Sequence, residues 1–310
     1  MKAVALTSLE TPPAVREDLP KPTPERDQVL VRVRASSVNP ADNSISGGML
    51  KQMGIEYEFP VILGRDYAGV VEQVGPDVTR YNVGDDVFGF LLHANPSVRE
   101  GSWAEFIVVP EDTSVAPAPT GVDAAIAGAA PVAGIAAITA IDALAPSEGE
   151  TLLIVGATGG VGSFAVQLAS RAGATVVAPA LPEDETYLRE LGVSELLPRD
   201  GDLAATAGER HPDGFDAVLD LVNYAPDVPA TLVKDDGRVA SPTGAAGEGP
   251  GRTMVMAAPT RENLERLGGM LADGTLRLPV QATYDLAKAP DALTALATSH
   301  TQGKLAIRIQ

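Results

Sequence analysis

The fold of this chain is decided by one stretch, Leu152-Leu153-Ile154-Val155-Gly156-Ala157-Thr158-Gly159-Gly160-Val161-Gly162. Its apolar start predicts a buried strand, and the following segment, Phe164–Ala169, predicts a helix. Without Cβ atoms, the first three glycines let the backbone turn sharply and approach a pyrophosphate, while Gly162 lets helix and strand pack closely. The helix N-terminus adds free N–H groups and a partial positive charge. We therefore predict a dinucleotide-binding turn formed by Gly156, Ala157, Thr158, Gly159, Gly160, Val161 and Gly162.

A glycine-rich turn can also serve only to connect two elements. The surroundings favour dinucleotide binding, because a second strand, Ala174–Ala178, and a second helix, Glu183–Leu191, follow. Further strands are expected at 217–222, 238–241 and 254–257. Strands that alternate with helices and have uncharged interiors predict a doubly wound parallel sheet of the Rossmann type, covered on both faces. No Gly-Lys-Ser/Thr sequence follows the glycines, which argues against a P-loop.

Two further segments follow predicted strands of this sheet. Ligands of open α/β sheets gather beyond the carboxyl ends of the strands, so we expect both segments beside the bound dinucleotide. They supply as candidate cofactor-binding residues Leu221, Val222, Asn223, Thr243 and Gly244.

The first third of the chain predicts an antiparallel β domain. Short segments rich in β-branched residues, at 29–33, 70–74, 86–90 and 106–109, are separated by Pro and Gly. The low-charge stretch 122–145 contains Asp123, Pro131 and Asp142 and owes its apolarity mainly to Ala, so it predicts buried helix and not a membrane span. We expect a β-rich domain over residues 1–122 and a dinucleotide-binding domain over 123–258. A returning segment, 259–310, with a helix at 260–272 and a strand at 304–309, would complete the first domain.

Composition excludes several classes of function. A formal net charge of −18 leaves no basic face for nucleic acid or an anionic membrane. The chain has no cysteine, which rules out disulfides, thiolate metal ligands and a cysteine nucleophile. Its start turns polar too early for a signal peptide, so we expect a cytoplasmic protein.

Six sequence blocks besides the glycine turn carry a family resemblance that covers nearly the whole chain: Ala35-Ser36-Ser37-Val38-Asn39-Pro40-Ala41-Asp42, Gly64-Arg65-Asp66-Tyr67-Ala68-Gly69-Val70-Val71, Val83-Gly84-Asp85-Asp86-Val87-Phe88-Gly89, Gly101-Ser102-Trp103-Ala104-Glu105-Phe106, Asp236-Gly237-Arg238 and Gly303-Lys304. Through them the chain resembles the quinone oxidoreductase and enoyl reductase branch of the medium-chain dehydrogenase/reductase superfamily. The resemblance implies an α/β protein in which a GroES-like, β-rich substrate domain accompanies the Rossmann domain. Several of the glycines in these blocks read equally well as plain turn residues.

The same resemblance implies that zinc is absent. The zinc-dependent branch has Gly-His-Glu where this chain has Gly64-Arg65-Asp66, and it uses cysteines that are missing here. We expect Arg65 and Asp66 to pair with each other. The three histidines, His93, His211 and His300, are widely separated among polar residues and are expected at the surface or in loops, not as metal ligands.

Four residues are candidates for the reaction site: Asn39, Asp42, Tyr57 and Tyr67. By resemblance, Asn39 lies beside the nicotinamide, where it could donate a hydrogen bond to a substrate carbonyl, and Asp42 shares its loop. Asn39-Pro40 can equally be a plain turn and Asp42 a helix cap. Tyr57 and Tyr67 could each donate a phenolic proton, wall the substrate site or pack in the core. A donor would meet the negative charge that appears on oxygen when hydride reaches carbon.

Cofactor choice depends on the segment after the second strand of the sheet. Many relatives place Ser or Thr there, followed by Lys or Arg, to hold the 2′-phosphate of NADPH. This chain has Leu181, which cannot donate, and then the consecutive carboxylates Glu183, Asp184 and Glu185, which would repel a phosphate. We therefore expect weak selectivity for NADPH, with NADH and NADPH both candidates. Alternatively, the carboxylates form only an acidic first helical turn, and an arginine from elsewhere serves the phosphate.

Together these features predict a metal-free, NAD(P)H-dependent reductase of small-molecule quinones or enones. Relatives often have Leu-Thr-Ala where this chain has Ile135-Ala136-Ala137, so a hydroxyl that can contact the nicotinamide is missing. A redox-silent relative that binds the nucleotide and acts as a regulatory or binding protein is therefore the alternative. Zinc-free alcohol oxidation is less favoured, because no Tyr/Lys proton relay is evident. We also expect a homodimer that pairs edge strands of the dinucleotide-binding sheet.

Overall fold

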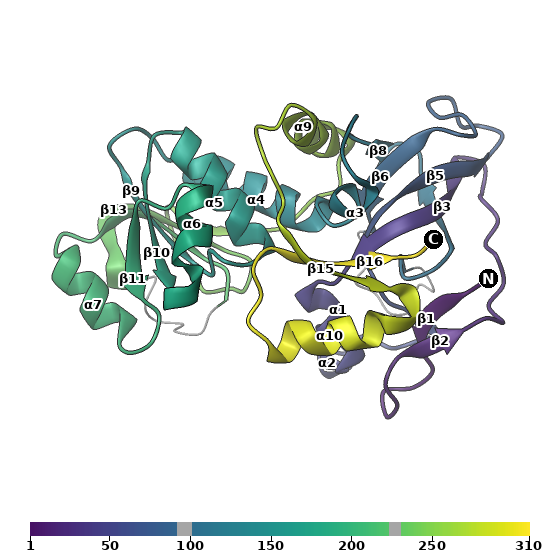
Figure 1. Cartoon of the computed structure of the whole chain (residues 1–310), viewed down its shortest axis with the longest axis horizontal. Coiled ribbons are helices and arrows are strands. Elements are labelled where there is room, and N and C mark those ends of the chain that lie inside the picture. The colour runs from purple at the N-terminus through teal and green to yellow at the C-terminus, as the bar shows by residue number, and fades with distance from the viewer. Residues whose placement is uncertain (92–100, 223–230) are drawn as a thin grey trace. The chain divides into compact units, whose positions relative to one another are not determined.

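The computed structural model describes residues 1–91, 101–222 and 231–310. Their contacts divide the chain into two units (Figure 1): residues 1–132, 258–275 and 280–310 form the first, and residues 133–257 with 276–279 form the second. We expected the boundary after residue 122, which is earlier than the division after Val132 that the contacts give. The first unit extends further because α3 (Ala124–Ala127) packs on its strands. No helix among the described residues is long and apolar enough to cross a membrane.

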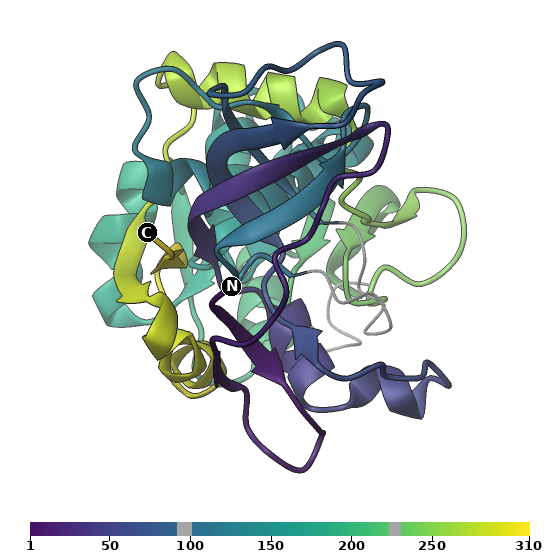
Figure 2. The same cartoon turned by 90° about the vertical axis from the view of Figure 1, so that its right-hand side faces the viewer.

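The first unit contains two sheets and both ends of the chain (Figure 2). The larger sheet has seven strands in the order β15-β16-β3-β5-β6-β8, with β7 paired to β3. Its strands are antiparallel except for the parallel pair β15 and β16. They are β3 (Gln28–Ser37), β5 (Asp66–Val74), β6 (Asp86–Phe90), β7 (Phe106–Pro110), β8 (Ala116–Pro117), β15 (Val280–Asp285) and β16 (Lys304–Arg308).

The smaller sheet of the first unit has the order β2-β1-β4. It consists of β1 (Ala3–Leu6), β2 (Ala14–Arg16) and β4 (Val61–Ile62), and one apolar core joins it to residues of β16 and α10. The other elements of this unit are α1 (Pro40–Ser46), α2 (Met49–Gln52), α9 (Arg261–Ala272), the 3-10 turn η2 (Leu286–Lys288) and α10 (Ala289–Thr298).

The second unit is a six-stranded parallel sheet in the order β11-β10-β9-β12-β13-β14. Numbered along the chain, this is the order 3-2-1-4-5-6 of dinucleotide-binding folds, which reverses direction between β9 and β12. The strands are β9 (Thr151–Val155), β10 (Thr175–Ala180), β11 (Glu195–Pro198), β12 (Phe215–Asp220), β13 (Val233–Ser241) and β14 (Arg252–Met254). They alternate with α4 (Pro131–Leu144), α5 (Gly160–Arg171), η1 (Pro182–Asp184), α6 (Glu185–Leu191) and α7 (Leu203–Arg210).

The main differences from the sequence predictions lie in short elements. The strand expected at 254–257 is β14, which runs from Arg252 to Met254 and leaves Met256 68% exposed. The helix expected from Glu183 begins instead with the 3-10 turn η1, because Asp184 is buried and bonds back to Leu181. β1, β2 and β11 have four residues or fewer and are too short for alternation to reveal them, whereas β15, with the sequence VQATYD, alternates and was missed.

Candidate functional site

Two glycines of the turn after β9 are required by its geometry. Gly156 has φ +90°, a conformation that L side chains rarely adopt, and a Cβ there would lie 2.9 Å from Cγ1 of Val222. A Cβ on Gly162 would lie 2.2 Å from the carbonyl oxygen of Gly156, so only glycine lets α5 start this close to the turn. At Gly159, φ is −75° and the nearest atom would be 3.7 Å away. Close helix packing therefore depends on Gly156 and Gly162.

The first turn of α5 presents backbone donors at the carboxyl edge of the sheet. The first helical hydrogen bond runs from Ser163 N to Gly159 O over 2.8 Å, so the amides of residues 160–162 precede the helical ladder. They carry the positive end of the helix dipole, and Ala157 beside them is buried. These residues could hold the phosphates of a dinucleotide.

The other predicted cofactor residues also follow strands of this sheet. Leu221 and Val222 come directly after β12, where Leu221 N donates to Val155 O over 3.0 Å. Thr243 follows β13, and its amide donates to Ser241 Oγ over 3.1 Å. Gly244 has φ +88° and open space around it. Asn223 lies outside the described residues. The second unit thus gathers the described candidates at one edge of one sheet.

In the first unit, a buried network surrounds the carboxylate of Asp66. Its Oδ2 accepts from Ser37 Oγ at 2.6 Å and from Asn39 Nδ2 at 2.8 Å, and its Oδ1 accepts from Val132 N at 2.7 Å. Lys304 Nζ lies 3.4 Å from the same Oδ2, and the two side chains are 6% and 0% exposed. This is a buried ion pair whose carboxylate is also fully hydrogen-bonded.

Lys304 also fixes the position of Asn39. Its ammonium donates to Asn39 Oδ1 over 2.7 Å and to Val38 O over 2.9 Å, so each of its three protons has an acceptor. Burial lowers the pKa of Lys304, and the charges of Asp66 and Asp42 partly restore it. The Asn39 amide, with its oxygen on Lys304 and its nitrogen on Asp66, is held from both ends.

Asp42 is the third residue of the short helix α1, and its carboxylate completes a capping box with the N-cap residue Asn39. It is completely buried and accepts from Asn39 N at 2.8 Å and from Gly64 N at 2.9 Å. Burial raises the pKa of Asp42, and the nearby charge of Arg65, itself 4% exposed, partly opposes that rise. The structure therefore shows the capping arrangement that the sequence left open.

Both candidate tyrosines donate their hydroxyl protons to backbone carbonyls. Tyr67 is completely buried and donates to Ser114 O over 2.7 Å, and burial raises its pKa well above the usual value. Tyr57 is half-buried and donates to Ile45 O over 2.8 Å. The structure thus brings Asn39 and Asp42 into one bonded network and holds the two tyrosines by separate contacts.

The polar groups of this network do not suit a catalytic zinc ion. The oxygens of Asp66 already accept from Ser37, Asn39 and a backbone amide, and the buried cation beside them is Lys304. A divalent ion there would be repelled by that ammonium. Within residues 1–91, 101–222 and 231–310, no group of three or more His, Asp or Glu residues could hold a metal ion. His211 instead bonds Glu195 at 3.1 Å, and His93 lies outside the described residues.

Sequence reasoning missed the roles of Lys304 and Ser37. Both stand in blocks that carried the family resemblance, and Lys304 is a charged residue that begins a strand and is followed by three apolar residues. A charge in such a position is a signal for a buried partner. Nothing in the sequence pairs it with Asp66, because the two residues are 238 positions apart.

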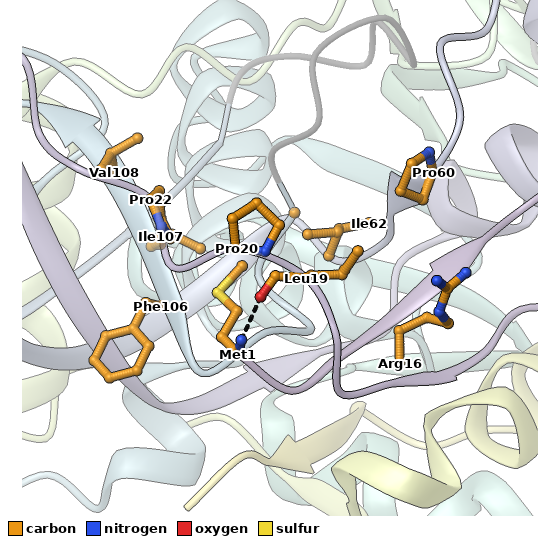
Figure 3. Close-up of a pocket in the computed structure, with 11 residues that line it drawn as sticks. Met1, Arg16, Leu19, Pro20, Pro22, Pro60, Ile62, Phe106, Ile107 and Val108 are labelled. Carbon is orange, nitrogen blue, oxygen red and sulfur yellow. Dashed lines mark hydrogen bonds between the residues drawn. The ribbon is translucent and has the colours of Figure 1, made fainter.

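The first unit also contains an apolar pocket of about 450 Å³ (Figure 3). Its walls include Leu19, Pro20, Ile62 and Phe106, and the ammonium of Met1, which also lines it, donates to Leu19 O. None of the predicted site residues lines this pocket.

Comparisons with known proteins agree with these two units. The model of the alcohol dehydrogenase GroES-like domain matches residues 25–120, and that of the zinc-binding dehydrogenases matches residues 191–307. A chloroplast envelope quinone oxidoreductase homolog of Arabidopsis thaliana is 30% identical over 316 residues, which cover 93% of this chain and 92% of that protein.

Two further similarities extend over most of the chain. The 2-methylene-furan-3-one reductase of Solanum lycopersicum is 31% identical over 292 residues, 92% of this chain and 73% of that protein. The solved structure of the quinone oxidoreductase from Coxiella burnetii matches with a TM-score of 0.89 and 27% identity, over 100% of this chain and 99% of that one. This chain is therefore an oxidoreductase of the quinone oxidoreductase branch of the medium-chain dehydrogenase/reductase superfamily.

Proposed function

We propose that this protein reduces a quinone, or the activated double bond of an α,β-unsaturated ketone, with NADPH or NADH and without a metal ion. The observation that carries the proposal is the glycine turn at the switch point of a 3-2-1-4-5-6 sheet, with Gly156 and Gly162 fixed by geometry. Relatives that are described as a quinone oxidoreductase homolog and a 2-methylene-furan-3-one reductase support the substrate class.

The reduced nicotinamide supplies the hydride when it is bound. In an enone the hydride adds to the β-carbon, the C=C bond becomes a single bond, and negative charge appears on the carbonyl oxygen until the α-carbon takes a proton. A quinone accepts the hydride and one proton and leaves as the hydroquinone. The protein therefore has to position the acceptor and stabilise charge on oxygen.

Asn39, Asp42, Tyr57 and Tyr67 contribute to this reaction by holding the backbone of the substrate domain in place. Each of their described polar groups is bonded inside the protein, and the Asn39 amide is bonded at both its oxygen and its nitrogen. In this proposal water delivers the proton, so no tyrosine has to ionise.

The test is an assay of the purified protein with NADPH or NADH and a panel of simple quinones and enones, following the loss of reduced-nicotinamide absorbance. We expect turnover that a chelator leaves unchanged, and elemental analysis without stoichiometric zinc. Nucleotide binding without turnover of any acceptor would support the redox-silent alternative. Activity that follows the zinc content would overturn the metal-free mechanism.

We also propose that the protein forms a homodimer through β14. This strand is an edge of the parallel sheet; its last residue, Met254, is 56% exposed, and Met256 just beyond it is 68% exposed. An unprotected edge strand with apolar neighbours favours pairing with a second copy. Light scattering at micromolar concentration should show a dimer, and Met254→Lys should shift it toward monomer.

A further inference from the structure

The ends of strands β10 and β11 place an arginine beside the dinucleotide-binding edge. Ala180 and Pro198 are paired in register, and Arg199 N donates to Ala180 O over 3.0 Å. Both strands run parallel to β9, so Arg199 follows its strand at the same edge of the sheet as the glycine turn. Arg199 is exposed.

Helix α6 links this corner to the glycine turn. The hydroxyl of Tyr187 donates to Thr158 O over 3.3 Å, and burial raises the pKa of Tyr187 to about 12. In dinucleotide-binding sheets the adenosine ribose is read at the carboxyl end of the second strand, here β10. The segment after β10, which would bind the ribose, is therefore linked through α6 to the glycine turn, which would bind the phosphates.

The three carboxylates after β10, at residues 183–185, do not form one negatively charged cluster. β10 ends with Ala180, and Leu181 follows it; neither can accept a bond from a ribose hydroxyl through its side chain. Asp184 is completely buried and accepts from Leu181 N at 3.2 Å, while Glu185 lies 3.7 Å from Arg189. The repulsion expected from three adjacent carboxylates is thereby reduced, and the usual acceptor for a free ribose hydroxyl is missing.

We propose that Arg199 binds the 2′-phosphate of the cofactor and makes the protein prefer NADPH to NADH. This inference rests on the proposed function and names the residue that selects the cofactor. A guanidinium can bind a phosphate through two parallel charge-assisted hydrogen bonds, which a ribose hydroxyl cannot match. Exposed Glu183 and Asp200 lie close in sequence to the two strand ends and weaken the attraction, so we expect a preference of about tenfold.

The experiment measures binding and not turnover. Calorimetric titration with adenosine 2′,5′-bisphosphate and with adenosine 5′-monophosphate isolates the 2′-phosphate, because the two probes differ only there. The wild-type protein should bind the bisphosphate about ten times more tightly, and Arg199→Gln should bring the ratio close to one with unchanged affinity for the monophosphate. Arg199→Lys keeps the charge but cannot form the two parallel hydrogen bonds, so its ratio of affinities should lie between those of the wild type and Arg199→Gln.

Arg171→Gln is the matched control. Arg171 is an exposed arginine that ends α5 at the opposite edge of the sheet, and its replacement removes the same charge. If it lowers the ratio as much as Arg199→Gln does, or if the wild type binds both probes equally, the assignment of Arg199 is wrong while nucleotide binding stands. Binding of neither probe would overturn the proposed function and this inference together.

Discussion

The Asp66 network of the first unit and the glycine turn of the second fix the position of the backbone in opposite ways. Around Asp66, polar side chains fill the interior, and the ammonium of Lys304 meets a carboxylate, an amide oxygen and a backbone carbonyl. At the turn, side chains are missing where the backbone must come close, as at Gly156 and Gly162. The first region should therefore be sensitive to the loss of a polar group, and the second to the gain of a single methyl group.

The largest effect is expected from Lys304→Met. The substitution leaves the completely buried carboxylate of Asp66 without its cation, which should lower the free energy of unfolding by about 3–5 kcal/mol. Urea denaturation at neutral pH measures this change. Arg308→Ala, which removes a partner of exposed Asp285, is the control and should cost about 0.5 kcal/mol or less.

The double variant Lys304→Met/Asp66→Asn sharpens that test. With both charges removed, it should be more stable than Lys304→Met alone, because no unpaired charge remains buried. If Lys304→Met lowers the free energy of unfolding by less than about 1 kcal/mol, the buried pair contributes no more to stability than an exposed ion pair does.

A smaller effect is expected from Gly162→Ala. The added Cβ would lie 2.2 Å from Gly156 O, so α5 must move away from the turn, at about 1–3 kcal/mol of stability and at least about tenfold in affinity for the nucleotide. Gly208→Ala is the matched control, since Gly208 lies in α7, outside the turn, and its Cβ would find no atom within 4 Å. Titration with NADPH compares the two variants, and equal affinities would mean that close helix packing is not what forms the site.

The second unit has a lysine–aspartate pair of its own, which allows a direct comparison with Lys304 and Asp66. Asp216 contacts Lys234 at 2.5 Å and accepts from Thr151 N at 2.8 Å, and its side chain is 22% exposed. Burial alone would raise the pKa of Asp216, but the bonds to Lys234 and Thr151 lower it to about 2.

The pH dependence of Asp216→Asn follows from this lowered pKa. Because the carboxyl ionises more readily in the folded state, its stabilisation is present above its ordinary pKa of 3.8 and is lost as the pH falls through about 2. Asp216→Asn should lower stability by about 2 kcal/mol at pH 7, and the difference from wild type should shrink between pH 4 and pH 2. Denaturation at pH 7 and pH 3 tests this, with exposed Asp235→Asn as the control. A difference that grew toward acid pH would contradict it.

The smallest effect is expected from Tyr57→Phe. Its hydroxyl donates to Ile45 O, and if water delivers the proton, its removal should change kcat by no more than about twofold, or roughly 0.4 kcal/mol. Steady-state kinetics with one quinone and one enone check this. A fall of about a hundredfold, without a change in the unfolding free energy, would identify Tyr57 as the proton donor.

The sequence predicts backbone features of this fold more completely than side-chain partners. Glycines in the run 156–162 predict the turn because their conformational freedom is a local property, and Thr151–Val155 is recognisable as a strand from its apolar run. The network around Asp66 joins residues from β3, β5 and β16, and no local pattern reports which of them meet. Asn39 was singled out by resemblance, but the bonds that hold its amide come from tertiary structure.

The pairing of β16 with β3 sets the order in which the chain can mature on the ribosome. Ala306 aligns with Ser37, so the larger sheet of the first unit stays incomplete until β16 has been synthesised. The strands of the second unit all lie between Thr151 and Met254 and can assemble earlier. At a synthesis rate of about 5–20 residues per second, many seconds pass between the synthesis of β3 and that of its partner β16. During synthesis those strands expose an unpaired edge, which is a site for pairing with other chains.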